Sequence, residues 1–104
     1  MKRGALRNWN PTRKGEDRCR ACGSRDYLSL HHIIPRSICP PEARTDLRNG
    51  VTLCSACHEL WHAGVPMSRS LLAVEEWEYV SSLELTGREV AYYLDKHYPE
   101  KRAA

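Results

Sequence analysis

Two C-x2-C pairs constrain this chain more than any other feature of its sequence. The pairs are Cys19/Cys22 and Cys54/Cys57. Four thiolates spaced in this way can surround one tetrahedral Zn²⁺, and two such pairs in 104 residues favour zinc over four unrelated cysteines. The gap between the pairs is longer than in a compact zinc ribbon, so we expect a structural unit between them. The fifth cysteine, Cys39, lies in a proline-rich loop and is expected to be a bystander thiol.

A zinc ion would supply stability that the apolar residues alone do not. The chain contains no phenylalanine and only 8% aromatic residues, so its hydrophobic core is expected to be small. It has neither the apolar segment of a signal peptide nor an apolar run long enough to span a bilayer. We therefore expect a cytoplasmic protein, in a reducing compartment where paired cysteines hold metal more often than they form disulfides.

Basic residues are concentrated at the N-terminal end. Residues 1–26 carry eight Lys/Arg against three Asp/Glu, although the formal net charge of the whole chain is only +3. This pattern is typical of an arm that contacts a polyanion, most often nucleic acid, and equally of a solvated tail. We expect residues 1–16 to form an irregular basic arm. Its candidate DNA contacts are Lys2, Arg3, Arg7, Arg13 and Lys14.

The segment between the cysteine pairs has the pattern of two strands and a helix. Alternating apolar residues predict a strand over 27–34, which Pro35 ends, and a short second strand over 51–53. A proline- and charge-rich loop over 35–49 joins them. A helix is expected over 58–63, ending at Gly64.

The C-terminal third is expected to contain two short helices. Ala73, Trp77 and Val80 form one apolar stripe at helical spacing. Residues 86–89 match a capping box, and Val90, Tyr93, Leu94 and His97 follow it at helical spacing. We expect both helices to pack on the core.

Four of the five histidines form two pairs. His31 and His32 end the first predicted strand, and His58 and His62 lie one turn apart on one face of the predicted helix. An i,i+4 histidine pair binds metal well, and a third ligand from a neighbouring strand leaves coordination positions open. Open positions distinguish a catalytic metal from a structural one.

Together these motifs resemble the HNH endonuclease family. The resemblance spans residues 19–62 and rests on Cys19-x2-Cys22, His31-His32-Ile33-Ile34-Pro35, Asn49, Cys54-x2-Cys57 and His58-x3-His62. It implies a small α+β fold, in which a ββα-metal (HNH) core is stapled by a four-cysteine zinc site and followed by C-terminal helices. The expected divisions are the arm over 1–16, the nuclease core over 17–64 and a helical extension over 65–104.

The resemblance also implies roles for individual residues. His32 is similar to the general base that takes a proton from the attacking water, and Asn49 to the residue that ties down the loop before it. His31 is also expected to take part in catalysis. It resembles the metal ligand on the first strand, a position that is Asp in many relatives. His58 and His62 resemble the ligands on the helix. Arg36 follows the strand, where its guanidinium suits the scissile phosphate.

The implied function is a metal-dependent endonuclease that hydrolyses DNA phosphodiester bonds and leaves a 5′-phosphate and a 3′-hydroxyl. Its cofactors would be a structural Zn²⁺ and one catalytic divalent ion, either Mn²⁺, Ni²⁺, Co²⁺, Mg²⁺ or Zn²⁺. Its partner would be DNA, and the four-cysteine form is common in phage and restriction-type proteins, which is compatible with packaging or restriction partners. The alternative is a non-catalytic zinc module that binds DNA or protein. That alternative explains the cysteines and the basic arm but not the spaced histidines.

Overall fold

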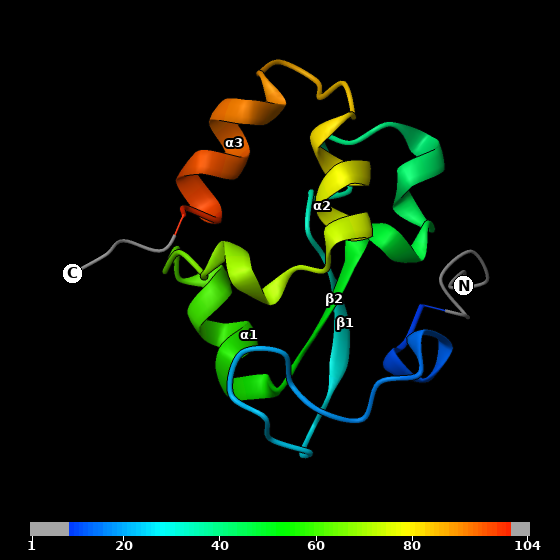
Figure 1. Cartoon of the computed structure of the whole chain (residues 1–104), viewed down its shortest axis with the longest axis vertical. Helices are drawn as coiled ribbons and strands as arrows, with labels where there is room; N and C mark the ends of the chain where they lie inside the picture. Colours follow the sequence, from blue (N-terminus) through cyan, green and yellow to red (C-terminus); the bar gives the residue numbers. More distant parts are fainter. Residues whose placement is uncertain (1–8, 101–104) are drawn as a thin grey trace.

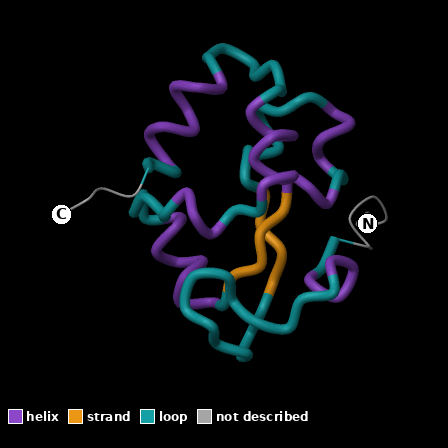
Figure 2. The backbone as a smooth tube through the Cα atoms, viewed as in Figure 1, coloured by secondary structure: helices purple, strands orange, loops and turns teal. Residues whose placement is uncertain are grey.

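Two antiparallel strands lie at the centre of the chain, with helices around them (Figure 1). The computed structural model describes residues 9–100. Strand β1 spans Ser29–His32 and strand β2 spans Gly50–Leu53, and their register places His32 opposite Gly50. Figure 2 shows this strand pair in orange. His31 and His32 are the last two residues of β1, so this strand pair positions both.

Strand β1 is shorter than the strand predicted over 27–34. Tyr27 has a φ of +52° and is 84% exposed, so the backbone is not yet extended there. At the other end, the amide of Ile34 donates to Oδ1 of Asn49 instead of to a strand carbonyl. The strand therefore ends at His32, although the alternating apolar pattern continues to Ile34, because the Asn49 side chain takes the place of a strand partner there.

Helix α1 spans Ser55–His62 and follows β2 directly, which completes the expected ββα order. The helix begins three residues before the predicted start at residue 58. The reason is that Cys54 is its N-cap, and the amide of His58 donates to the Cys54 carbonyl. The second cysteine pair is thus not a separate turn, because Cys57 lies within the first turn of α1.

The two C-terminal helices are confirmed as α2, over Val74–Ser81, and α3, over Val90–His97. They share one hydrophobic core with the sheet, and Val80 and Leu94 are almost completely buried in it. The small α+β fold class is therefore confirmed. Short 3-10 helices interrupt the loops at Pro11–Lys14, Pro41–Arg44, Leu47–Asn49 and Arg69–Leu71.

The capping box predicted over residues 86–89 is wrong. Gly87 has a φ of +75°, which places the chain in a turn before the helix. The N-cap of α3 is Glu89, and its side chain makes no capping hydrogen bond. The periodicity of the helix was informative here, whereas the capping motif was a chance match.

The described part of the N-terminal arm, residues 9–16, is packed on the core rather than irregular. Trp9 donates from Nε1 to the carbonyl of Leu30, at 2.9 Å. Lys14 donates from Nζ to the carbonyl of Gly50, at 2.8 Å. Both contacts reach the strand pair, so this segment is part of the fold.

None of the helices between residues 9 and 100 has the length and apolar character that crossing a bilayer requires.

Candidate metal centres and active site

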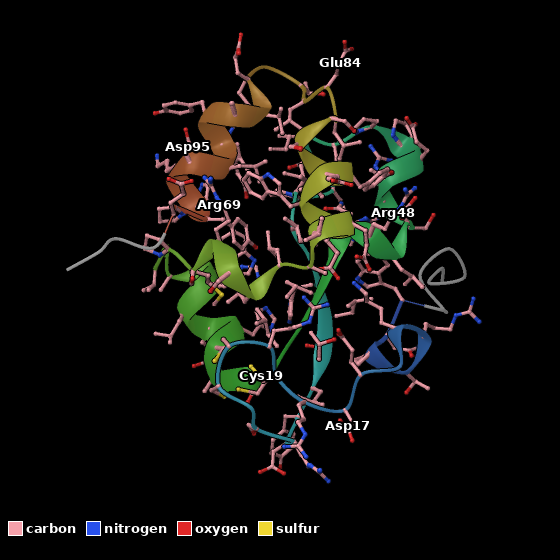
Figure 3. The ribbon with its side chains drawn as sticks, in the orientation of Figure 1. Asp17, Cys19, Arg48, Arg69, Glu84 and Asp95 are labelled. Atoms are coloured by element: carbon pink, nitrogen blue, oxygen red, sulfur yellow. The ribbon has the colours of Figure 1, made fainter. Side chains whose placement is uncertain are left out.

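The four paired cysteines meet at the first turn of α1. Their sulfur atoms lie within 4.8 Å of one another, and Sγ of Cys22 is 3.6 Å from Sγ of Cys54. Two thiolates on one Zn²⁺ with bonds of about 2.3 Å lie about 3.8 Å apart, so this set fits a tetrahedral zinc ion. Figure 3 labels Cys19 beside the start of α1, with further sulfur atoms in yellow close to it.

The surroundings of Cys19 favour the thiolate form that binds metal. Burial opposes ionisation of Cys19, but backbone hydrogen bonds, chiefly from Cys54, outweigh it and lower the pKa of this thiol to about 6. The knuckle closes through the Gly23 amide, which donates to the Cys19 carbonyl, and Gly23 has the left-handed φ of +82° that this turn requires. Cys39 is buried apart from this cluster, as expected of a bystander.

Three histidines form a second cluster between β1 and α1. His31, His58 and His62 each offer one nitrogen, and these nitrogens lie within 4.8 Å of one another. The rings of His31 and His58 are closest, with centroids 3.7 Å apart, and those of His58 and His62 are 4.4 Å apart. One strand residue and an i,i+4 pair therefore converge on one point, in an arrangement that suits a divalent ion.

Two histidines of the cluster, His31 and His58, favour the neutral form that a metal requires. Burial, together with the neighbouring rings of His58 and His62, lowers the pKa of His31 to about 4. Burial and His62 also lower the pKa of His58. The hydroxyl of Ser29 lies 2.8 Å from Nε2 of His31 and fixes the rotation of that ring.

His32 follows the cluster on β1 but makes different contacts. Its Nε2 lies 2.7 Å from the carbonyl of Arg44, which accepts the ring N–H and leaves Nδ1 as the nitrogen that can take a proton. Burial lowers the pKa of His32, and the charge of Arg36 acts in the same direction, although the bond to Arg44 opposes both. Trp9 stacks on one face of this ring, at 4.2 Å between centroids and 15° between planes.

Asn49 joins the two ends of the loop between the strands. It is fully buried, and its side-chain amide donates to the carbonyls of Ile34 and Ala43, while Oδ1 accepts from the Ile34 amide. Its own carbonyl accepts from the amide of Ile33, directly after His32. The side chain therefore holds the loop from which the Arg44 carbonyl reaches His32.

A model of the HNH endonuclease family matches residues 19–64 of the chain. This match assigns residues 19–64 to the HNH endonuclease family. The matched segment contains both clusters, from Cys19 to the end of α1 at His62. Comparison with curated proteins and with solved structures returned no match.

The remaining predicted DNA contacts lie in different surroundings. Arg36 is exposed and lines the same cleft as His31, His32 and His62, where a phosphate would reach it. Arg13 is exposed on the packed part of the arm. Lys2, Arg3 and Arg7 lie outside the described residues.

Lys14 makes internal contacts instead of facing solvent. Its side chain is 11% exposed, and its amine forms an ion pair with Glu76 as well as the hydrogen bond to Gly50. Two of its three N–H donors are used inside the fold, and its charge is already paired with a carboxylate, so little of it is available to a phosphate. We therefore leave Lys14 out of the DNA surface proposed below.

Sequence reasoning missed two side chains of the HNH site region. Trp9 stacks on His32 from a segment with no recognisable motif. Glu76 is 2% exposed on α2 and binds Arg20 of the first knuckle through two hydrogen bonds, of 2.6 and 2.9 Å. Both residues lie far along the chain from their partners, so no local spacing marks them.

Proposed function

We propose that this chain is a metal-dependent DNA endonuclease that hydrolyses phosphodiester bonds by a histidine general base and one divalent ion. The observation that carries the proposal is a cluster of three ligand histidines, two of which, His31 and His62, line a cleft together with His32. The ring of His32 is held by the Arg44 carbonyl. A structural zinc module needs the four cysteines but has no use for this second set. The histidine set therefore favours the nuclease over a non-catalytic module.

The residues would divide the chemistry between them. His31, His58 and His62 would hold the ion, which when bound stabilises the negative charge that grows on the phosphate and on the leaving 3′ oxygen. His32 would accept a proton at Nδ1 from the water that attacks phosphorus, as the bond from phosphorus to the 3′ oxygen breaks. The Arg44 carbonyl keeps the proton on Nε2 and also stabilises the imidazolium that forms.

Two further residues would act on the substrate and on the loop. Arg36 would pair with a phosphate oxygen at the rim of the cleft, since a guanidinium presents a fork of donors. Asn49 would keep the Arg44 carbonyl in place and so fix the orientation of His32. By resemblance to the family, the products carry a 5′-phosphate and a 3′-hydroxyl.

The proposal is tested by incubating supercoiled plasmid with the wild type and His32→Ala, prepared identically. We expect the wild type to nick or linearise the plasmid and His32→Ala to be slower by about 10²–10⁴-fold, the typical contribution of a positioned base. Zinc content and circular dichroism show whether both proteins are folded. Equal cleavage by the two proteins would contradict the role of His32, and no cleavage by either in any metal would support the non-catalytic module.

A metal series in the same assay tests the three-histidine shell. Imidazole favours Mn²⁺, Co²⁺, Ni²⁺ and Zn²⁺, whereas Mg²⁺ prefers oxygen ligands and gives up water reluctantly. We expect Mn²⁺, Co²⁺ or Ni²⁺ to support cleavage at lower concentration than Mg²⁺. Saturation by Mg²⁺ at the lowest concentration would contradict a shell made of three imidazoles.

A further inference from the structure

The cleft beside the histidine cluster extends beyond the residues that the chemistry needs. It has a volume of about 430 Å³ and reaches from His31 and His32 to the last turn of α3. Its far wall is aromatic and consists of Trp61, Tyr93 and His97. Figure 1 shows why, since the last turn of α3 lies next to the last turn of α1. Two of the three wall residues lie outside the segment matched by the family model, which ends at residue 64.

The aromatic wall is held rigidly in place. His97 packs on Trp61 edge to face, with centroids 5.4 Å apart, and on Tyr93 at 4.3 Å. The carbonyl of His97 accepts from the amide of Met67, at 3.0 Å. Arg69, labelled in Figure 3, fixes the same end of α3 through its bond to Asp95. The wall is therefore preformed, so little ordering is needed before a ligand binds.

Charge around the cleft is positive. Arg36 is exposed at its rim, next to the histidine cluster. Burial is the main cause that lowers the pKa of His97. The positive charges of Lys96 and Arg88 lower it further, so both cations lie near this ring. A ligand with an aromatic face and an attached negative charge would match both the aromatic wall and the positive charge of this cleft.

We propose that this wall, formed by Trp61, Tyr93 and His97, is a binding subsite for an unpaired nucleobase next to the scissile phosphate. The inference rests on the proposed nuclease function and names the part of the substrate that the cleft would hold. Aromatic side chains stack on unpaired bases of any sequence, whereas a base inside a duplex has both faces covered by its neighbours. With its phosphate near Arg36, such a nucleotide places its base against the wall. The subsite favours single-stranded or locally opened DNA over intact duplex.

The test compares two single strands that differ only in their bases. One is a twelve-residue oligothymidylate, and the other is an abasic strand of the same length and charge, both carrying the same fluorescent label. Binding is measured by fluorescence anisotropy with wild-type protein that retains its structural zinc, without any other divalent metal, so that no turnover occurs. We expect the thymidylate strand to bind about fivefold or more tightly than the abasic strand, as base stacking on aromatic side chains implies.

Two variants on α3 locate the effect. His97→Ala removes one ring of the wall and should bring the two affinities closer together, while His97→Phe keeps a ring and should retain the difference. Tyr92→Ala is the matched control, because Tyr92 is 66% exposed on the same helix and does not line the cleft. Circular dichroism and zinc content verify that each variant is folded.

The outcomes separate this inference from the nuclease proposal. Equal affinity of the wild type for both strands, or an equal loss in His97→Ala and Tyr92→Ala, would overturn the subsite whatever the plasmid assay shows. Base-dependent binding that His97→Ala alone reduces supports the subsite even if no metal supports cleavage. In that case the nuclease proposal is tested by the plasmid assay alone.

Discussion

Trp9 lies outside the family segment, but it contacts His32, the proposed general base, inside that segment. Its ring stacks on His32, and its Nε1–H group donates to the carbonyl of Leu30. It also lies over Gly50, where a Cβ would come within 3.0 Å of the Trp9 ring and 2.9 Å of Leu30. Gly50 has an ordinary extended backbone, so a glycine suits this position for lack of space and not for its conformation. Packing on both strands thus fixes Trp9 against the proposed base.

We predict that Trp9→Ala lowers kcat for plasmid cleavage by about tenfold or more while changing KM little. The physical reason is that His32 would lose the surface that limits its rotation, and a small misplacement of a catalytic group is costly. Trp9→Phe keeps a stacking ring and should recover most of the rate. The measurement is steady-state cleavage by all three proteins, with melting temperatures as the folding control. Equal losses in the Ala and Phe variants would show that Trp9 acts through stability alone.

At the scale of elements, α2 is joined to the zinc knuckle and the N-terminal arm by one buried carboxylate. Glu76 accepts from Arg20, forms an ion pair with Lys14 and accepts from the amide of Ala73 at the start of its own helix. Burial alone would raise the pKa of Glu76, but the hydrogen bonds from Arg20 and Lys14 outweigh it and lower the pKa to about 2. The carboxylate is therefore ionised and satisfied on several sides.

We predict that Glu76→Gln destabilises the protein by about 3 kcal/mol at pH 7. The substitution removes the carboxylate that pairs with the largely buried Lys14 and leaves Arg20 with Glu16 alone. Glu75→Gln is the matched control, since Glu75 is exposed one residue earlier on the same helix. The measurement is urea unfolding of zinc-loaded protein. Similar free energies of unfolding for the two variants would contradict a stabilising role for Glu76.

The same pair of proteins gives a pH dependence of known sign. A carboxyl whose pKa is lower in the folded state stabilises the fold fully above its ordinary pKa of about 4.5, and this contribution is lost as the pH falls towards about 2. The stability difference between the wild type and Glu76→Gln should therefore be constant from pH 7 to pH 5 and shrink below about pH 4.5. Comparing the two proteins cancels acid release of zinc, which both share. A difference that grows as the pH falls would have the wrong sign.

At the scale of the whole molecule, the zinc site and the histidine cluster are linked through α1. Cys57 closes the zinc site and His58, the next residue, belongs to the histidine cluster. The first knuckle is also tied to β2, because the Arg20 amide donates to the Thr52 carbonyl at 2.9 Å. Structural zinc supplies folding free energy in small domains. We therefore expect a zinc ion to stabilise the packing of α1 on the strand pair, and so the positions of the histidines.

We predict that Cys54→Ser loses bound zinc and most of its native structure. The matched control is Cys39→Ser, since Cys39 is 4% exposed and lies outside the four-cysteine cluster. The control should keep full zinc content, with only the modest destabilisation that a buried polar replacement causes. Metal analysis and circular dichroism on both proteins provide the measurement. Full zinc content and a native spectrum in Cys54→Ser would contradict the structural zinc site.

The basic N-terminal residues allow a separate test of DNA affinity. Deleting residues 1–8 removes Lys2, Arg3 and Arg7 but keeps Trp9 and the packed 3-10 helix Pro11–Lys14. If these three residues bind phosphates, DNA affinity should fall, and the slope of log affinity against log salt should flatten by about 0.9 for each phosphate that is no longer neutralised. The measurement is DNA binding at several salt concentrations for both proteins. An unchanged slope would show that residues 1–8 are only a tail.

The pairs within the two candidate ligand sets were predictable, because local geometry alone brings the two members of each pair together. Two residues separated by x2 in a turn, or by x3 on a helix, lie close together whatever the rest of the chain does. That local rule placed Cys54 with Cys57 and His58 with His62 before any tertiary contact was known. The same sequence patterns pointed to the HNH family and to the order of two strands and a helix.

Tertiary structure alone decided what surrounds those ligands. Trp9 lies 23 residues before His32, and Glu76 is separated by 56 residues from Arg20 and by 62 from Lys14. Such pairs have no spacing rule, because they depend on how separate elements pack against each other. The aromatic wall of α3 has the same origin, since helical periodicity identified Tyr93 and His97 as one face but not the cleft that this face meets. Sequence thus determined which residues make up the pairs of the two candidate metal sites, because their spacing is local. Packing determined how those pairs meet, and which neighbours contact the proposed base and enclose the cleft.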